Sequence, residues 1–319
     1  MKELYGNGLL IYHVYCDLNG PVPEHECCPI SGTLLLSFLS SCAGGVAGST
    51  LANYTASVKA WHVLHGQPWN IHQDELKLTL QGAAHFAPSH SKRDKRPPMM
   101  VDDLKIIRAN LNLNDPGDAT IYACIAVGFY CAARLGELTV PNLRKNFDPK
   151  KYITRKNFSA LTDQHGLPVM KFHLPITKCE PRGKDIQCAP QTNCITDPQF
   201  ALDNHIRLNP APHDANLFAW KHPKNGLRPL SRTQVTNKLT KIAKRHKLAD
   251  LKGHSLRIGG TLFYLLKGVP FDVVKVIGRW AGESFILYLR LHTLILAPYL
   301  QANKQVFDNF IQIAMPPVR

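Results

Sequence analysis

Two arginines and the polar residues near them are the first candidates for chemistry in this sequence. Arg134 follows an apolar run in which an unpaired guanidinium would be costly to bury, and Glu137 lies three residues on, on the same helical face. Taken alone, this pair favours a plain internal ion pair. His254 and Arg257 stand one helical turn apart, so that both side chains can face one small anion site. An isolated His-x-x-Arg, however, is a weak motif.

Three further residues fit either a functional position or a purely structural one. Trp280 follows a glycine by two residues and fits a core indole, and Tyr288 lies in an otherwise apolar stretch and fits a half-buried phenol. Lys178 lies near the tip of a predicted β-hairpin, where Lys184 in the same turn is an alternative functional lysine. None of these residues indicates a chemistry by itself.

Charge is the feature of the composition that says most about partners. The chain has 319 residues, with 38 lysines and arginines against 23 acids, so its formal net charge is +15. This excess indicates a polyanionic partner and argues against an enzyme that acts on small cations. Residues 1–91 carry three lysines and six acids, a net charge of −3, which leaves +18 for residues 92–319.

The change in composition falls on a short basic segment, residues 92–98, which contains two prolines. Its four cations are Lys92, Arg93, Lys95 and Arg96. Prolines and clustered like charges disfavour a helix, so we predict an extended linker between two domains, although an exposed basic loop would have the same composition. A length of 319 residues fits two domains better than one core.

Cysteine usage and hydropathy bear on compartment, metal and membrane. Nine cysteines, an odd number without framework spacing, indicate reduced thiols and an intracellular protein. The cysteines most suggestive of metal ligands lack the C-x-x-C spacing of zinc sites, so we predict no metal site; they are Cys27, Cys28, Cys179, Cys188 and Cys194. The charge-free run 27–58 is broken by glycines before twenty apolar residues accumulate, which excludes a membrane span there.

Apolar periodicity predicts four helices in the first 91 residues. They are expected over residues 4–17, from Gly32 with Ser31 as N-cap, from Ser49 as N-cap to a stop at Gly66, and over 74–85. The aromatic residues of this region are expected to form its core. The region is therefore predicted to be a small four-helix bundle.

The second part is predicted to be mostly helical with one short sheet insert. An apolar helix begins at Asp118 or Thr120 and runs through Cys131. Alternation over 170–174, a polar turn and a return strand over 185–189 predict a β-hairpin. Four more helices are expected over residues 231–247, 256–267, 270–277 and 297–313.

The order of these residues resembles the tyrosine recombinase (phage integrase) family. Arg-x-x-Glu, a hairpin lysine, His-x-x-Arg, Gly-x-Trp and then Tyr follow one another as they do in that family, and several stretches are most similar to Cre-like enzymes and fungal Crypton-type mobile-element recombinases. The resemblance covers residues 97–300 well. It implies a mainly α fold: a helical core-binding (SAM-like) domain over 1–91, the linker 92–98, and a mixed α/β catalytic domain over 99–319 with a small β-hairpin or sheet and a C-terminal helix.

The resemblance also implies a role for each residue of the constellation. The catalytic residues would be Arg134, Glu137, Lys178, His254, Arg257, Trp280 and Tyr288, with the linker cations binding DNA. Two features depart from the family. Trp280 and Tyr288 are eight residues apart instead of nine, and the region before residue 92 is acidic for a domain that clamps DNA.

The chemistry of a metal-independent DNA strand break fits these residue types. Tyr288 would attack the phosphorus and form a 3′-phosphotyrosyl bond, while Lys178 protonates the departing 5′-oxygen. Arg134 and Arg257 offer planar forks that bind a phosphate bidentately. His254 can exchange a proton with the phenol, and the Trp280 indole N–H can donate to a non-bridging oxygen. Glu137 would hold Arg134. No cofactor is required.

Two functions follow as alternatives, namely an active site-specific recombinase or integrase, and a domesticated DNA-binding protein that keeps the fold without strand exchange. A topoisomerase-like relaxase is a third. Every catalytic residue type is present, which favours the enzyme. Apolar residues at helical spacing over 306–311 need a burial partner in cis or in a neighbouring protomer. The resemblance implies double-stranded DNA as partner, a dimer on one site and a homo-tetramer across two, and a nuclear location if the source is eukaryotic.

Overall fold

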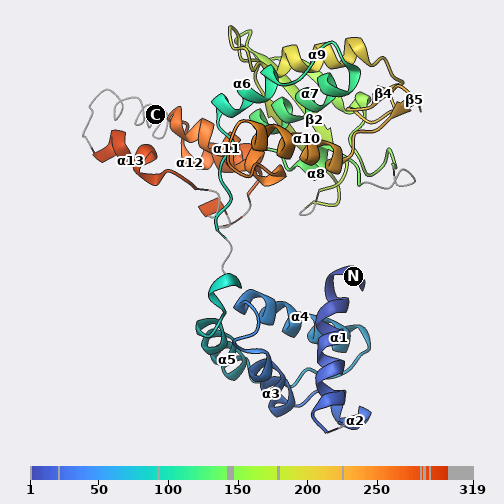
Figure 1. Ribbon diagram of the computed structural model, residues 1–319, viewed down its shortest axis with the longest axis vertical. Helices are drawn as coiled ribbons and strands as arrows, with labels where there is room; N and C mark the ends of the chain where they lie inside the picture. Colours follow the sequence, from blue (N-terminus) through green and yellow to red (C-terminus); the bar gives the residue numbers. More distant parts are fainter. Residues whose placement is uncertain are drawn as a thin grey trace. The chain divides into compact units, whose positions relative to one another are not determined.

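The structure is a computed structural model. It describes residues 2–20, 22–91, 94–141, 147–177, 180–224, 226–280, 282, 285–286 and 289–300, without side-chain detail at 2–5 and 298–300. The chain divides into two compact units, Met1–Lys95 and Arg96–Arg319 (Figure 1). This division falls inside the basic segment 92–98, whose role as a linker stays a prediction.

The first unit is a helical bundle. Its helices are α1 (Lys2–Leu18), α2 (Glu24–Cys27), α3 (Gly32–Cys42), α4 (Gly48–Leu64) and α5 (Gln73–His85), followed by the 3-10 turn η1 (Ser89–Ser91). Tyr12 packs edge-on against Phe38, with ring centroids 5.4 Å apart, and Tyr54 packs against the same buried cluster. The aromatic residues thus supply the core of the unit, as expected.

Helix starts in this unit were predicted with mixed success. The Ser31 hydroxyl accepts a hydrogen bond of 3.1 Å from the backbone N–H of Leu34, which confirms it as the N-cap of α3. The expected cap at Ser49 is wrong, because α4 begins at Gly48 with Ala47 at the N-cap position and no side-chain cap. Gly48 lies so close to α5 that a Cβ there would come within 2.7 Å of the Ala84 methyl. The start of α4 thus lies at a close approach to α5, which a local pattern does not reveal.

The second unit combines helices with two small antiparallel sheets. Its elements are α6 (Val101–Ala109), α7 (Pro116–Tyr130), α8 (Leu135–Leu138), η3 (Arg155–Asn157), β1 (Phe158–Thr162), β2 (Pro168–Leu174), β3 (Lys184–Cys188), α9 (Pro198–Leu208), β4 (Trp220–His222), β5 (Gly226–Arg228), α10 (Arg232–Arg245), α11 (Gly253–Leu266), α12 (Phe271–Gly278) and α13 (His292–Leu300). A mainly helical fold with a small sheet insert is therefore confirmed.

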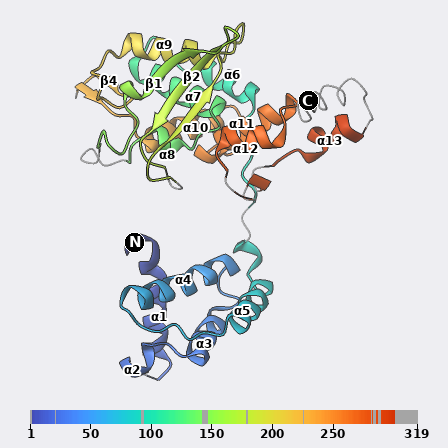
Figure 2. The ribbon, with the colours of Figure 1, turned by 180° about the vertical axis from the view of Figure 1, so that it is seen from behind.

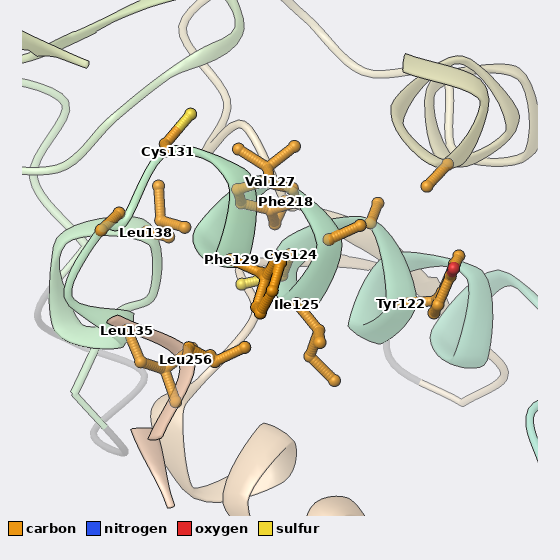
Figure 3. Packing of buried hydrophobic residues seen from close by; sticks show 14 of the residues in the cluster. Tyr122, Cys124, Ile125, Val127, Phe129, Cys131, Leu135, Leu138, Phe218 and Leu256 are labelled. Atoms are coloured by element: carbon orange, nitrogen blue, oxygen red, sulfur yellow. The ribbon is translucent and has the colours of Figure 1, made fainter. Parts of the chain in front are cut away.

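Helix α7 is the central element of the second unit. From Gly117 to Tyr130 every residue of α7 except Asp118 is buried, and Figure 3 shows Phe129 of this helix in the buried cluster with Leu135 of α8 and Leu256 of α11. The start predicted at Asp118 or Thr120 is too late. Asp115 caps the helix by accepting a 2.9 Å hydrogen bond from the N–H of Asp118, and Pro116 takes the first helical position.

The predicted β-hairpin is present and gains a third strand. β2 pairs antiparallel with β3, with Phe172 opposite Ile186, and β1 pairs with the other edge of β2 (Figure 2). Met170, Phe172 and Leu174 are buried. β1 was not predicted because most of its residues are exposed and no apolar face marks it.

Helices α10, α11 and α12 lie where periodicity placed them, with shifted ends, whereas α6 and α9 were not predicted. Helix α11 begins at Gly253, three residues before the predicted start, so His254 lies in its first turn. The helix predicted over 297–313 overlaps α13 (His292–Leu300) only at residues 297–300, and residues 301–319 lie outside the described part. Among the described residues, no helix has the length and apolar character needed to cross a membrane.

Two adjacent glycines of α11 allow the backbone of neighbouring segments to approach. A Cβ on Gly259 would lie 1.8 Å from the carbonyl oxygen of Met99, and a Cβ on Gly260 would lie 2.0 Å from that of Phe129 at the end of α7. Because backbone atoms cannot rotate away, a side chain at Gly259 would push α11 away from Met99, and one at Gly260 would push it off α7. The glycine pair therefore fixes the position of the segment that carries His254 and Arg257.

We expect Gly260→Ala to lower the free energy of unfolding by about 3 kcal/mol, because overpacking forces α11 and α7 apart. Urea denaturation followed by tryptophan fluorescence measures this loss. Gly82→Ala on α5 is the control, since nothing lies within 4 Å of its added Cβ, and it should stabilise by roughly 0.5–1 kcal/mol. Unchanged stability of Gly260→Ala would contradict the packing described here.

Candidate active site

A cationic cleft of about 770 Å³ opens in the second unit between α8, the start of α10 and the start of α11. Its lining contains Glu137 and His254 together with five cations, which are Arg96, Arg134, Lys151, Arg232 and Lys252. These side chains come from segments far apart in the sequence. The cleft is suited to bind an anion with several negatively charged groups along its length.

Arg134 and Glu137 face each other across the single turn of α8. The chain leaves α7 through Ala132, whose φ of 44° is left-handed, and Arg134 then occupies the N-cap position of α8. Its Nη1 donates to Glu137 Oε1 at 2.9 Å, and its backbone N–H donates to Oε2 at 2.9 Å. The predicted pair is therefore present. Its arginine, with 26% of the side chain exposed, lines the cleft.

Glu137 has a second arginine partner, which the sequence did not reveal. Arg279 Nη2 donates to Glu137 Oε2 at 2.7 Å. Burial raises the pKa of the Glu137 carboxyl, but the charge of Arg279 and hydrogen bonds from Arg279 and Arg134 outweigh burial and hold this pKa below its usual range. Glu137 is therefore ionised at neutral pH, and the three side chains together carry one net positive charge.

His254 lies in the first turn of α11 and lines the same cleft. Burial is the largest cause that lowers the pKa of its imidazole, and the charges of Arg96, Arg257 and Arg134 lower it further. The ring is therefore neutral at pH 7 and can accept a proton. His254 and Arg134 thus line one cleft.

Arg257 occupies a different environment from Arg134. It is completely buried, its Nη1 donates to the carbonyl of Ala132 at 2.8 Å, and its Nη2 donates to the carbonyl of Gly278. Its guanidinium carbon lies 4.1 Å from the centre of the Trp280 ring, a cation–π contact. A Cβ on Gly278 would lie 1.6 Å from this ring, so only glycine allows Trp280 to pack here. Arg257 and Trp280 form one stack next to the cleft.

Several predicted site residues lie outside the described part of the chain: Lys92, Arg93, Lys178 and Tyr288. Ile176 and Thr177, just before Lys178, line the cleft. The alternative lysine, Lys184, is the exposed first residue of β3 and pairs with Leu174 across the hairpin. Of the linker cations, Lys95 is exposed and Arg96 lines the cleft.

Sequence reasoning missed Lys151, Arg232, Lys252 and Arg279. Arg232 directly follows Ser231, the N-cap of α10, and Lys252 is itself the N-cap of α11. A position at a helix start is the local signal that could have identified these two residues. Within the described ranges, no three His, Cys, Asp or Glu side chains gather as metal ligands.

Comparison of the sequence with protein-family models and with curated proteins finds no match. The fold, in contrast, is similar to that of solved tyrosine recombinases. One is the XerH site-specific recombinase bound to its palindromic difH substrate, with 14% identity over 97% of this chain and 79% of that chain and a TM-score of 0.56. Another is the Tn1549 transposon integrase bound to circular intermediate DNA, with 12% identity over 92% and 98% and a TM-score of 0.50.

These likenesses establish the fold class. The mainly helical chain with its small antiparallel sheet has the tyrosine recombinase fold, as the sequence resemblance implied. The finer resemblance to Cre-like and Crypton-type enzymes stays a prediction.

We expect the imidazole of His254 to titrate below about 6.5, the ordinary value for histidine. Because the folded state binds this proton less tightly than the unfolded chain, His254 takes stability away as the pH falls below that value. Arg96→Gln should raise the pKa of His254 by removing a repulsive charge, as NMR titration would measure. Lys247→Gln, at the far end of α10 from the cleft, should not move it. An equal shift in both variants would refute this electrostatic explanation.

Proposed function

We propose that this protein is a site-specific DNA recombinase or integrase that cleaves and rejoins DNA through a 3′-phosphotyrosyl intermediate. The observation that carries the proposal is the cationic cleft in which Arg134 and the neutral His254 lie together. The tyrosine recombinase fold supports it, because the similar solved proteins are a site-specific recombinase and a transposon integrase, both bound to DNA.

In the proposed reaction, the phenol oxygen of Tyr288 attacks the phosphorus and passes its proton to neutral His254. The bond between phosphorus and the 5′-oxygen breaks, and Lys178 protonates that oxygen. Arg134 donates to the non-bridging oxygens, where negative charge grows in the transition state. Rejoining reverses each step, so neither a metal ion nor a cofactor is consumed.

Arg257 and Trp280 have a more limited role in this proposal. Arg257 is buried with two of its nitrogens on backbone carbonyls, so it acts beside the phosphate only after the Trp280 segment shifts on DNA binding. This burial is the observation that favours the alternative function, a DNA-binding protein that keeps the fold without strand exchange. Covalent trapping on DNA distinguishes the two functions.

Double-stranded DNA is the proposed partner. The +15 net charge and the cluster of cations around the cleft fit a phosphate backbone. Arg96, which belongs to the basic segment 92–98 and lines the cleft, would bind the same backbone. We propose a dimer on one DNA site and a homo-tetramer across two. Each protomer of this assembly would pass its C-terminal helix to a neighbour.

We expect Tyr288→Phe to bind duplex DNA like the wild type and to form no covalent adduct, because phenylalanine keeps the ring and removes the attacking oxygen. Incubation with a nicked suicide substrate in EDTA, followed by SDS electrophoresis, detects the adduct. Tyr152→Phe, which removes a tyrosine hydroxyl from the cleft lining, serves as the matched control that still forms it. An SDS-resistant adduct of Tyr288→Phe would make another residue, Tyr299 first, the nucleophile.

We expect truncation after Leu300 to leave single-site DNA binding largely intact and to abolish the two-site complex, because the apolar face over 306–311 would be lost. Native gel electrophoresis with one and two DNA sites measures both. The full chain is the reference for both complexes. Normal synapsis by the truncated protein would mean that the C-terminal helix packs in cis.

A further inference from the structure

Arg279 has a backbone conformation that arginine rarely adopts. It follows the last residue of α12 with φ 60° and ψ 46°, the left-handed region in which glycine is the usual residue at a helix end. Its side chain is nevertheless nearly inaccessible, with 5% of its surface exposed. A residue kept in an unfavourable conformation and buried there points to a requirement of the site, because such conformations persist only where surrounding contacts enforce them.

The contact that uses this side chain is the one with Glu137. The Glu137 carboxylate, 8% exposed, lies between Arg279 on one oxygen at 2.7 Å and Arg134 on the other at 2.9 Å. Little of these side chains is exposed to water, so their charges interact more strongly than they would at the surface. Arg279 therefore shares with Arg134 the only negative charge within this trio.

This sharing changes what Arg134 presents to a ligand. If Glu137 were paired with Arg134 alone, the two side chains would form a neutral pair, and an incoming phosphate would meet little net attraction. With Arg279 behind Glu137, the trio keeps one positive charge. Its most exposed member is Arg134, which lines the cleft, so the phosphate meets this charge there.

The same segment also supports the second arginine of the constellation. Gly278, immediately before Arg279, accepts a hydrogen bond from Arg257 through its carbonyl, and Trp280, immediately after, stacks on the Arg257 guanidinium. One left-handed residue thus ties the support of Arg134 to that of Arg257.

We propose that Arg279 is a positioning residue that counterbalances Glu137, so that Arg134 presents its positive charge to a DNA phosphate. The proposal rests on the proposed function for its catalytic consequence. It assigns Arg279 no contact with DNA, since its side chain lies behind Glu137 and does not line the cleft.

The test begins with Arg279→Gly, which removes the charge and suits the left-handed backbone. We expect a folded protein whose initial rate of adduct formation on the suicide substrate falls at least tenfold. Lys247→Gly is the matched control, because Lys247 is also basic and left-handed, with φ 52°. It lies at the opposite end of α10 from the cleft, about 20 Å along the helix. Equal rates for Arg279→Gly and the wild type would overturn the proposal.

A second substitution separates charge balance from mere packing. In Glu137→Gln/Arg279→Gly the carboxylate is gone, so its counter-charge is no longer needed, and we expect adduct formation at least tenfold faster than in Arg279→Gly alone. Arg279→Lys, which keeps the charge but not the planar fork, should fall between the wild type and Arg279→Gly. If the loss of rate in the double variant equals the product of the losses in Glu137→Gln and Arg279→Gly, the two residues act independently. Arg279 would then only pack, and the proposal would be overturned.

A readout without DNA keeps this test distinct from that of the function itself. NMR titration of ¹³C-labelled glutamate, with Glu137→Gln for assignment, should show the pKa of Glu137 rising in Arg279→Gly and staying in place in Lys247→Gly. An unmoved Glu137 overturns the proposal whatever the activity. If the wild type forms no adduct while this shift is seen, the proposed function fails and the charge relation between Arg279 and Glu137 stands.

Discussion

The carboxylate of Glu137 is the constraint on which the site depends. A carboxylate with 8% exposure is stable only when it is paired and hydrogen-bonded, and here two guanidiniums and one backbone N–H satisfy it. Those partners come from the N-cap of α8 and from the end of α12. Burying this one charge therefore fixes the distance between two segments that the chain order places far apart.

The helix packing around α7 makes that arrangement possible. Gly260 brings α11 against the end of α7, next to the left-handed Ala132 whose carbonyl accepts a hydrogen bond from Arg257. α11 in turn carries His254 in its first turn. Backbone contacts that tolerate no side chain thus position the helix that carries His254, while ion pairs hold the side chains of Arg134 and Glu137.

Local patterns in the sequence predict much of the fold and of the candidate site, and the parts that they miss depend on long-range contacts. Alternation revealed β2 and β3, and the three-residue spacing of Arg134 and Glu137 revealed their pair, because both signals lie within one element. Arg279 is 142 residues from Glu137, so no local period connects them. The start of α4, which lies against α5, and the exposed strand β1, which has no apolar face, were also missed, because neither leaves a local pattern.

Arg134 and Arg257 show that the same order of residues as in a family does not determine how accessible each side chain is. The resemblance gives Arg134 and Arg257 equal roles toward a phosphate, but the fold gives one a place in the cleft lining and the other a buried stack beneath Trp280. A guanidinium held by two carbonyls and a ring gains little by leaving them unless a more negative partner arrives. Under the proposed function, a phosphodiester in the cleft would be such a partner, and its charge would favour a shift of Arg257 out of the stack and toward the phosphate.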